Sequence, residues 1–163
     1  MKLNKFINDP KAVQFRKETA FRLCVEENGV TASFSQKYLN LAKEYLRDAC
    51  NVFREEILQT HISLIYVFSP KQCFPIDGFS SDMKDKKRHD TYQAIGIGTN
   101  ALDHGRCYSI FVFLHELTHL QFTHIQGGND HDAAFQNHLD KLLWKYWKAT
   151  GEAVPNYDLL NED

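Results

Sequence analysis

The sequence has no run of 18 residues free of charged side chains, and its formal net charge is only −2 at pH 7. The first absence argues against a membrane-spanning helix, which needs about 20 mainly apolar residues. The small net charge argues against a general electrostatic attraction to nucleic acid or acidic lipid. The apolar core of a signal peptide is also missing after Met1, so we expect a cytoplasmic protein.

Cysteine pairs of the C-x-x-C type are absent as well. The four cysteines are widely spaced, at Cys24, Cys50, Cys73 and Cys107. Zinc ribbons and thioredoxin-type redox sites both depend on C-x-x-C pairs, so neither class is indicated. In a cytoplasmic protein, four reduced thiols are the expected state.

The 163 residues, of which 43% are hydrophobic, are enough for one domain with its own core. Apolar periodicity and turn residues predict helices and strands in a mixed order. In chain order we expect a helix from Asp9-Pro10 to about Asn28-Gly29, a helix at about 35–59, a strand at 62–68, a polar loop at 70–90, a strand at 92–98, a connection at 100–105, a buried helix at about 107–124, and a last helix ending at Thr150-Gly151. This order predicts a single α+β domain over residues 1–163, with its core at about 35–150 and an N-terminal helical extension at 1–34.

The chemistry is concentrated in the predicted buried helix, which contains the H-E-x-x-H motif His115-Glu116-Leu117-Thr118-His119. Four residues correspond to about 400° of rotation and about 6 Å of rise, so both imidazoles project from one face. That arrangement lets two nitrogens share one tetrahedral Zn²⁺. Glu116 is then placed as the general base that takes a proton from a zinc-activated water.

A catalytic zinc usually has three protein ligands, so a third one is needed. His131 is our prediction, because the Gly127-Gly128 turn permits a reversal that returns it toward the first two ligands. We expect Asn129-Asp130 to cap the following helix, and Asp132 to accept a hydrogen bond from a ligand imidazole. The alternatives are His138, His104 and an acidic residue such as Glu152. His124 lies nine residues from His115, on the opposite face of a continuous helix.

These segments resemble the SprT-like (Spartan-type) zinc metallopeptidases and, in part, the related WLM and YgjP-like groups. The resemblance rests on the H-E-x-x-H segment and on His131-Asp132-Ala133-Ala134-Phe135, with weaker similarity over about residues 38–147. It implies a zincin-like fold with N-terminal helices, a small β-sheet, the motif helix and a C-terminal helix. It also implies an endopeptidase that acts on DNA-associated proteins.

Together the residues and the resemblance predict a zinc metalloendopeptidase, with His115, His119 and His131 as metal ligands and Glu116 as the catalytic base. The alternatives are a gluzincin-type peptidase with an acidic third ligand, and a zinc-stabilised interaction or nucleic-acid-binding module without turnover. We expect a monomer with a protein or peptide substrate. DNA binding should be weak or absent, routed through Lys84 to Arg88, and Trp144 and Trp147 should be packing residues.

Overall fold

The computed structural model describes residues 23–25, 32–68, 77–84, 91–126 and 132–157. It combines helices with one small β-sheet, in keeping with the predicted α+β class. A single cluster of buried side chains runs from Tyr38 to Val154 and joins the helices to the sheet.

The sheet has four strands in the spatial order β1-β2-β4-β3. Their bounds are Leu23–Val25 for β1, Ile62–Phe68 for β2, Gly78–Lys84 for β3 and Thr91–Gly98 for β4. β1, β2 and β4 are parallel, whereas β3 is antiparallel to β4 and lies at the edge. Branched side chains from the two central strands, such as Ile65 and Ile97, are buried in the core.

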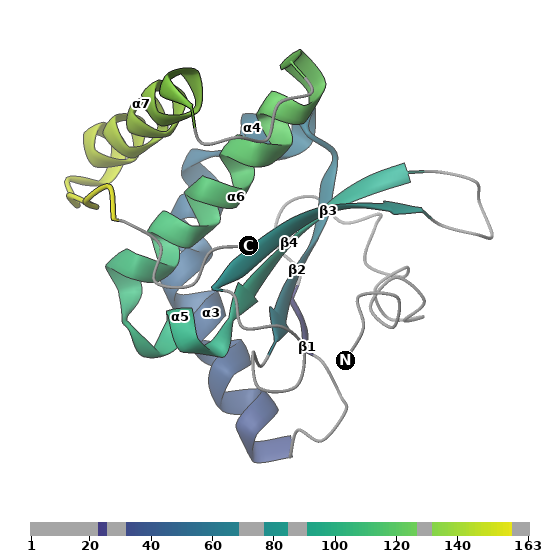
Figure 1. Ribbon diagram of the computed structural model, residues 1–163. Helices are drawn as coiled ribbons and strands as arrows, with labels where there is room; N and C mark the ends of the chain where they lie inside the picture. Colours follow the sequence, from purple (N-terminus) through teal and green to yellow (C-terminus); the bar gives the residue numbers. More distant parts are fainter. Residues whose placement is uncertain (1–22, 26–31, 69–76, 85–90, 127–131, 158–163) are drawn as a thin grey trace.

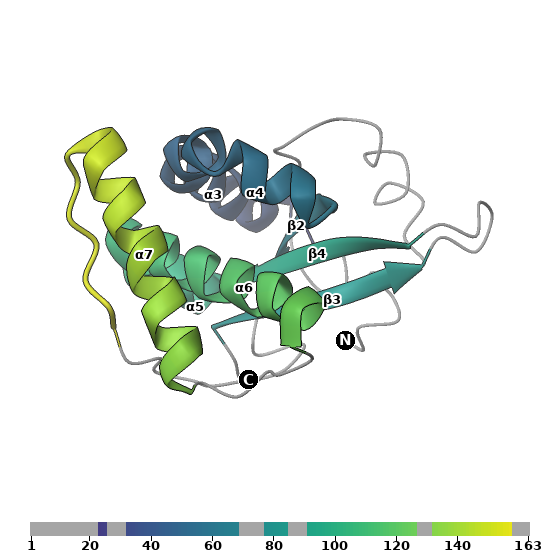
Figure 2. The same ribbon diagram turned by 90° about the horizontal axis from the view of Figure 1, so that it is seen from above.

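Helices pack on this sheet and on one another (Figures 1 and 2). Their bounds are Ala32–Val52 for α3, Arg54–Gln59 for α4, Thr99–Asp103 for α5, Arg106–Gln126 for α6 and Ala133–Thr150 for α7. α3 contacts β1 and β2, α6 contacts β4 and β3, and α7 packs on α6 and α3. α6 is therefore enclosed by the sheet, α3 and α7, which explains why its sequence is apolar on most faces.

Several sequence predictions are confirmed. The predicted strands at 62–68 and 92–98 match β2 and β4, and the predicted helix at about 107–124 matches α6. The last helix ends at Thr150, where Gly151 has a left-handed φ of 77° and donates to the Trp147 carbonyl. The predicted helix at about 35–59 is divided into α3 and α4 by a turn at Phe53, whose side chain is fully buried.

Three predictions were wrong. Residues 23–25 form strand β1 rather than part of a helix, because a parallel partner is available in β2, with Leu23 opposite Ile65. The expected loop at 70–90 contains β3, and the expected connection at 100–105 overlaps α5. β1 and β3 form because they pair with segments far away in the chain, and such pairing has no local sequence signal. The rest of the expected N-terminal helix, 9–22 and 26–29, lies outside the described residues.

The described residues contain no helix that is both long enough and apolar enough to cross a membrane.

Candidate metal centre

The centre is built on α6, where polar side chains interrupt a buried apolar helix. Thr118 satisfies its hydroxyl by donating to the Leu114 carbonyl at 2.7 Å, and Ser109 does the same to the Gly105 carbonyl at 2.8 Å. His115 and Glu116 are also buried, with exposed fractions of 4% and 1%. Burying an imidazole and a carboxylate costs free energy unless specific interactions compensate. The helix therefore concentrates polar groups where packing alone would favour apolar ones.

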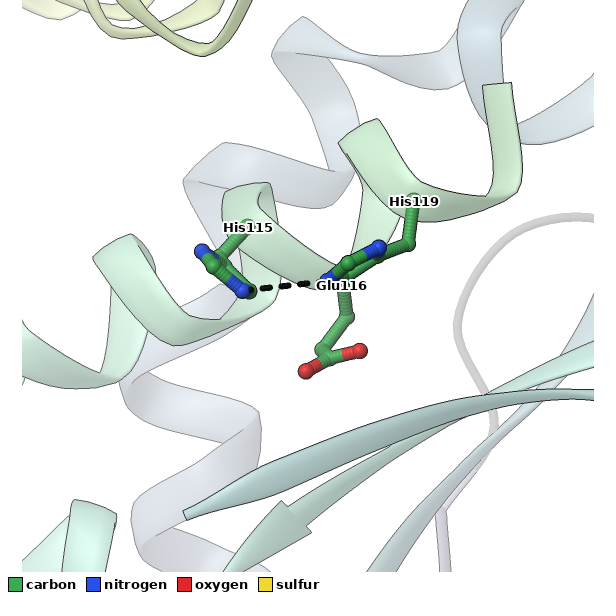
Figure 3. Close-up of side chains that lie close together, drawn as sticks. All are labelled: His115, Glu116 and His119. Atoms are coloured by element: carbon green, nitrogen blue, oxygen red, sulfur yellow. Dashed lines mark hydrogen bonds between the residues drawn. The ribbon is translucent and has the colours of Figure 1, made fainter. Parts of the chain in front are cut away.

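His115 and His119 turn their rings toward each other from successive turns of α6 (Figure 3). Their Nε2 atoms are 3.2 Å apart, which is within hydrogen-bonding distance, and the ring planes are inclined at 74°. Two imidazole nitrogens bound to one tetrahedral zinc lie about 3.3 Å apart, given Zn–N distances of about 2.0–2.1 Å. The spacing of the two nitrogens thus fits a shared zinc ion with little rearrangement.

Glu116 completes a group of three whose potential ligand atoms all lie within 4.8 Å of one another. Its side chain points toward the strands of the sheet (Figure 3). A β-carbon built on Gly78, the first residue of β3, would lie 3.4 Å from Cγ of Glu116. The carboxylate is therefore held between α6 and the start of the edge strand, beside the two imidazoles.

Aromatic rings from α6 and α7 lie against the imidazoles. The ring of Phe135 lies 5.1 Å from that of His115 and 4.7 Å from that of His119, and Phe111 lies 5.9 Å from His115. Phe135 is fixed in the first turn of α7 by the N-cap Asp132, whose Oδ1 accepts from the Phe135 amide at 2.8 Å. Asp132 therefore caps the helix, a role that was predicted for Asn129-Asp130.

The contact of Phe135 with the two imidazole rings places the first turn of α7 next to the histidine pair. His131, the predicted third ligand, lies outside the described residues. It directly precedes Asp132, the first described residue of this segment. The prediction that the helix is continuous through His124 is confirmed, because α6 extends to Gln126.

The alternative ligands are occupied elsewhere. His138 pairs with Gln121 at 2.7 Å, and burial, followed by the charge of Lys141, lowers its pKa. His104 is exposed and lies beside the Tyr108 ring. Glu152 accepts from Arg106 through both oxygens at 3.0 Å and from Tyr146 at 3.1 Å. Within the described ranges, only Glu116 joins the two imidazoles in a group of this kind.

The cluster around Arg106 fixes the N-terminal end of the motif helix. Arg106 also donates to Asp48 on α3 at 3.1 Å and to Tyr146 on α7 at 3.3 Å. Burial and the neighbouring Glu152 raise the pKa of Tyr146 to about 12. Cys107 and Cys50 are free thiols, and burial raises the pKa of both. These groups therefore serve the scaffold.

Around the candidate site, one prediction was wrong and two residues were not predicted. Trp144 and Trp147 are exposed by 58% and 48%, so the expectation that they are packing residues was wrong. Gly78, which adjoins Glu116, and Asp77, which directly precedes it, were not singled out from the sequence, because both lie in a segment expected to be loop. Aspartate and glycine are common turn residues, so nothing local in the sequence distinguishes Asp77 and Gly78 from a turn.

Comparison with protein-family models, curated proteins and solved structures finds no match to this chain.

Proposed function

We propose that this chain is a zinc-dependent metallopeptidase with a zincin-like fold, related to the SprT-like family. The observation that carries the proposal is the 3.2 Å separation of the His115 and His119 Nε2 atoms beside a buried glutamate. An H-E-x-x-H pattern on an exposed helix would have no such significance. Here His115 and Glu116 are buried in the core of the fold, where packing alone favours apolar residues, and His119 adjoins them.

Each residue has a distinct role in this proposal. His115 and His119 would hold the metal through their imidazole nitrogens, and His131 remains the predicted third ligand. A bound zinc ion would supply Lewis acidity and lower the pKa of a water to about 7. The Glu116 carboxylate would act as the general base toward the attacking water and would then deliver the proton to the amine of the leaving peptide. Phe135 and Phe111 hold the imidazoles in place.

The edge strand β3 supports an extended peptide as the substrate class. An edge strand can accept an additional strand through its backbone N–H and C=O groups. In the part of the chain that the structure describes, β3 pairs only with β4. Since β3 begins against Glu116, a peptide added to it is brought to the same end of the sheet as the proposed general base. The resemblance adds DNA-associated proteins as candidate substrates, with weak DNA affinity of the chain itself.

The two alternatives differ from this proposal in the role of Glu116 or in the third metal ligand. A non-catalytic zinc module needs the ligands but no general base, and structural zinc sites usually close with four protein ligands. A gluzincin-type site needs an acidic third ligand, yet Glu152 is engaged by Arg106 and Tyr146. The burial of Glu116 beside the histidine pair therefore favours a peptidase over a non-catalytic module, and the engagement of Glu152 favours a third histidine over an acidic third ligand.

Cleavage of a denatured protein by the zinc-loaded chain tests the proposal, with Glu116→Gln as the decisive variant. Glutamine preserves size and hydrogen bonding but cannot take the proton, and loss of a general base typically lowers the rate by about 10²–10⁴-fold. We expect this loss with zinc content unchanged. Equal cleavage by both proteins would exclude Glu116 as the base, and no cleavage by the wild type would favour the non-catalytic module.

A further inference from the structure

Asp77 directly precedes the edge strand and is fully buried. Its carboxylate accepts hydrogen bonds from Asn100 Nδ2 on α5 and from the Tyr108 hydroxyl on α6. Its backbone carbonyl accepts from the Gly98 amide at the end of β4, at 2.8 Å. A single residue thus joins β3, β4, α5 and α6.

The same network adjoins the candidate metal centre on two sides. Gly78 follows Asp77 and lies against Val112 and Glu116 of α6. Tyr108 is seven residues before His115, which is about 700° of rotation, so the two project from nearly the same face of the helix. The Tyr108 ring lies 6.1 Å from Phe111, whose ring in turn lies 5.9 Å from His115.

We propose that Asp77 is a positioning residue that locks the start of the edge strand β3 onto the motif helix α6, and thereby sets the place of the substrate strand relative to Glu116. The inference rests on the proposed function for its catalytic consequence, but the locking itself does not. Asp77 does not touch the reacting atoms. It acts through Gly78, the contact between β3 and the glutamate.

The physical reason lies in the energetics of a buried carboxylate. Hydrogen bonds to a charged acceptor are about twice as strong as neutral ones, and they hold a fixed geometry. An edge strand has a partner on one side only, so its first residues open more readily than those of a central strand. Asp77 supplies the missing restraint at the end of β3 that faces α6.

Amide hydrogen exchange of Asp77→Asn provides the test without reference to activity. The neutral amide removes the charge, so the hydrogen bonds with Asn100 and Tyr108 lose their charge assistance even where the two amides reorient to keep them. We expect exchange within residues 78–84 to accelerate by about tenfold or more, while β2 and α6 keep their protection. Unchanged exchange in β3, or equal acceleration in all elements, would overturn the proposal.

A reciprocal exchange provides the rescue experiment. In Asp77→Asn with Asn100→Asp, the donor and the acceptor trade places, and Tyr108 still finds the carbonyl oxygen of the new asparagine. We expect protection of β3 to return, and failure to return would contradict the pairing. The matched control is Asp103→Asn, which likewise removes the charge from a carboxylate on α5, one that accepts from the Tyr38 hydroxyl at 3.0 and 3.1 Å. It should leave β3 unchanged.

Kinetics then separate this inference from the proposed function. In an active wild type, Asp77→Asn should retain its zinc and lower kcat/KM by about tenfold, with recovery in the double variant. If the wild type has no peptidase activity, the proposed function fails, while hydrogen exchange still decides whether Asp77 locks β3. Full activity in a variant with a loosened β3 would overturn the catalytic consequence.

Discussion

A β-carbon on Gly78 of β3 would lie 2.6 Å from Cγ1 of Val112 on α6. The same atom would lie 2.9 Å from the carbonyl oxygen of Gly96 on β4. Glycine is therefore the residue that lets the edge strand, the neighbouring strand and the motif helix meet beside Glu116. A side chain at this position would separate the sheet from the helix.

Gly78→Ala should destabilise the protein, because overpacking against backbone and a buried valine costs about 1–3 kcal/mol. The free energy of unfolding from a denaturant titration measures the change. Ser80→Ala on the same strand is the control, since Ser80 is only partly buried, and it should cost less. A Gly78→Ala protein as stable as the wild type would show that β3 does not pack as tightly on α6 as the structure indicates.

His131→Ala should weaken zinc binding and abolish peptidase activity, because a three-histidine site loses one of its ligands. His124→Ala should leave both nearly intact, since α6 is continuous through position 124 and nine residues separate it from His115. Zinc competition with a chelator measures the affinities of the two variants. The reverse pattern would assign the third ligand to His124 and contradict the site as described.

The sequence could predict the elements that carry their own periodicity and caps. α6 and α7 show apolar residues at helical spacing, and Gly151 marks the end of α7, so both were predicted within a few residues. The same logic predicted the H-E-x-x-H face, because the spacing of His115 and His119 depends only on helix geometry. The imidazole pair follows directly from that local geometry.

The missed features depend on partners far away in the chain. β3 forms because it pairs with β4, with Phe79 opposite Gly96. Its sequence is mostly polar and lacks the alternation of apolar and polar residues that is typical of a strand. Asp77 gains its role from Asn100 and Tyr108, which are 23 and 31 residues away. The exposure of Trp144 and Trp147 depends on which face of α7 meets α6 and α3, and aromatic content does not determine it.

His61→Gly should stabilise the protein. His61 follows α4 with a φ of 56°, a left-handed conformation that costs a side chain about 1–2 kcal/mol and costs glycine little. Each kcal/mol corresponds to about 2–4 °C in a domain of this size, so we expect the thermal midpoint to rise by a few degrees. His104→Gly is the control, since this C-cap of α5 has a φ of −78° and should gain nothing. A lower midpoint for His61→Gly than for the control would contradict the argument.

Acidification should destabilise the protein in part through His138. Burial, then the charge of Lys141, lowers its pKa in the folded state, while Glu56 opposes the shift. The unfolded chain therefore binds the proton first as the pH falls below about 6.5. The stability that this residue contributes is present above that pH and is lost as the pH falls through the lower folded pKa.

Thermal midpoints of the wild type and His138→Gln at about pH 7.5 and about pH 5.5 measure this effect. Glutamine keeps a hydrogen-bonding group near Gln121 but does not titrate. The wild type should lose more stability between the two pH values than the variant. An equal loss in both proteins would show that His138 does not contribute to the acid response.

The central claim is that His115 and His119 hold a metal ion, and the zinc content of the purified protein tests it most directly. We predict about one zinc per chain in the wild type and in His104→Ala, whose histidine is exposed and outside the group. His115→Ala and His119→Ala should each be nearly free of zinc while retaining the fold, as monitored by circular dichroism. Full zinc occupancy in both of these variants would contradict the account.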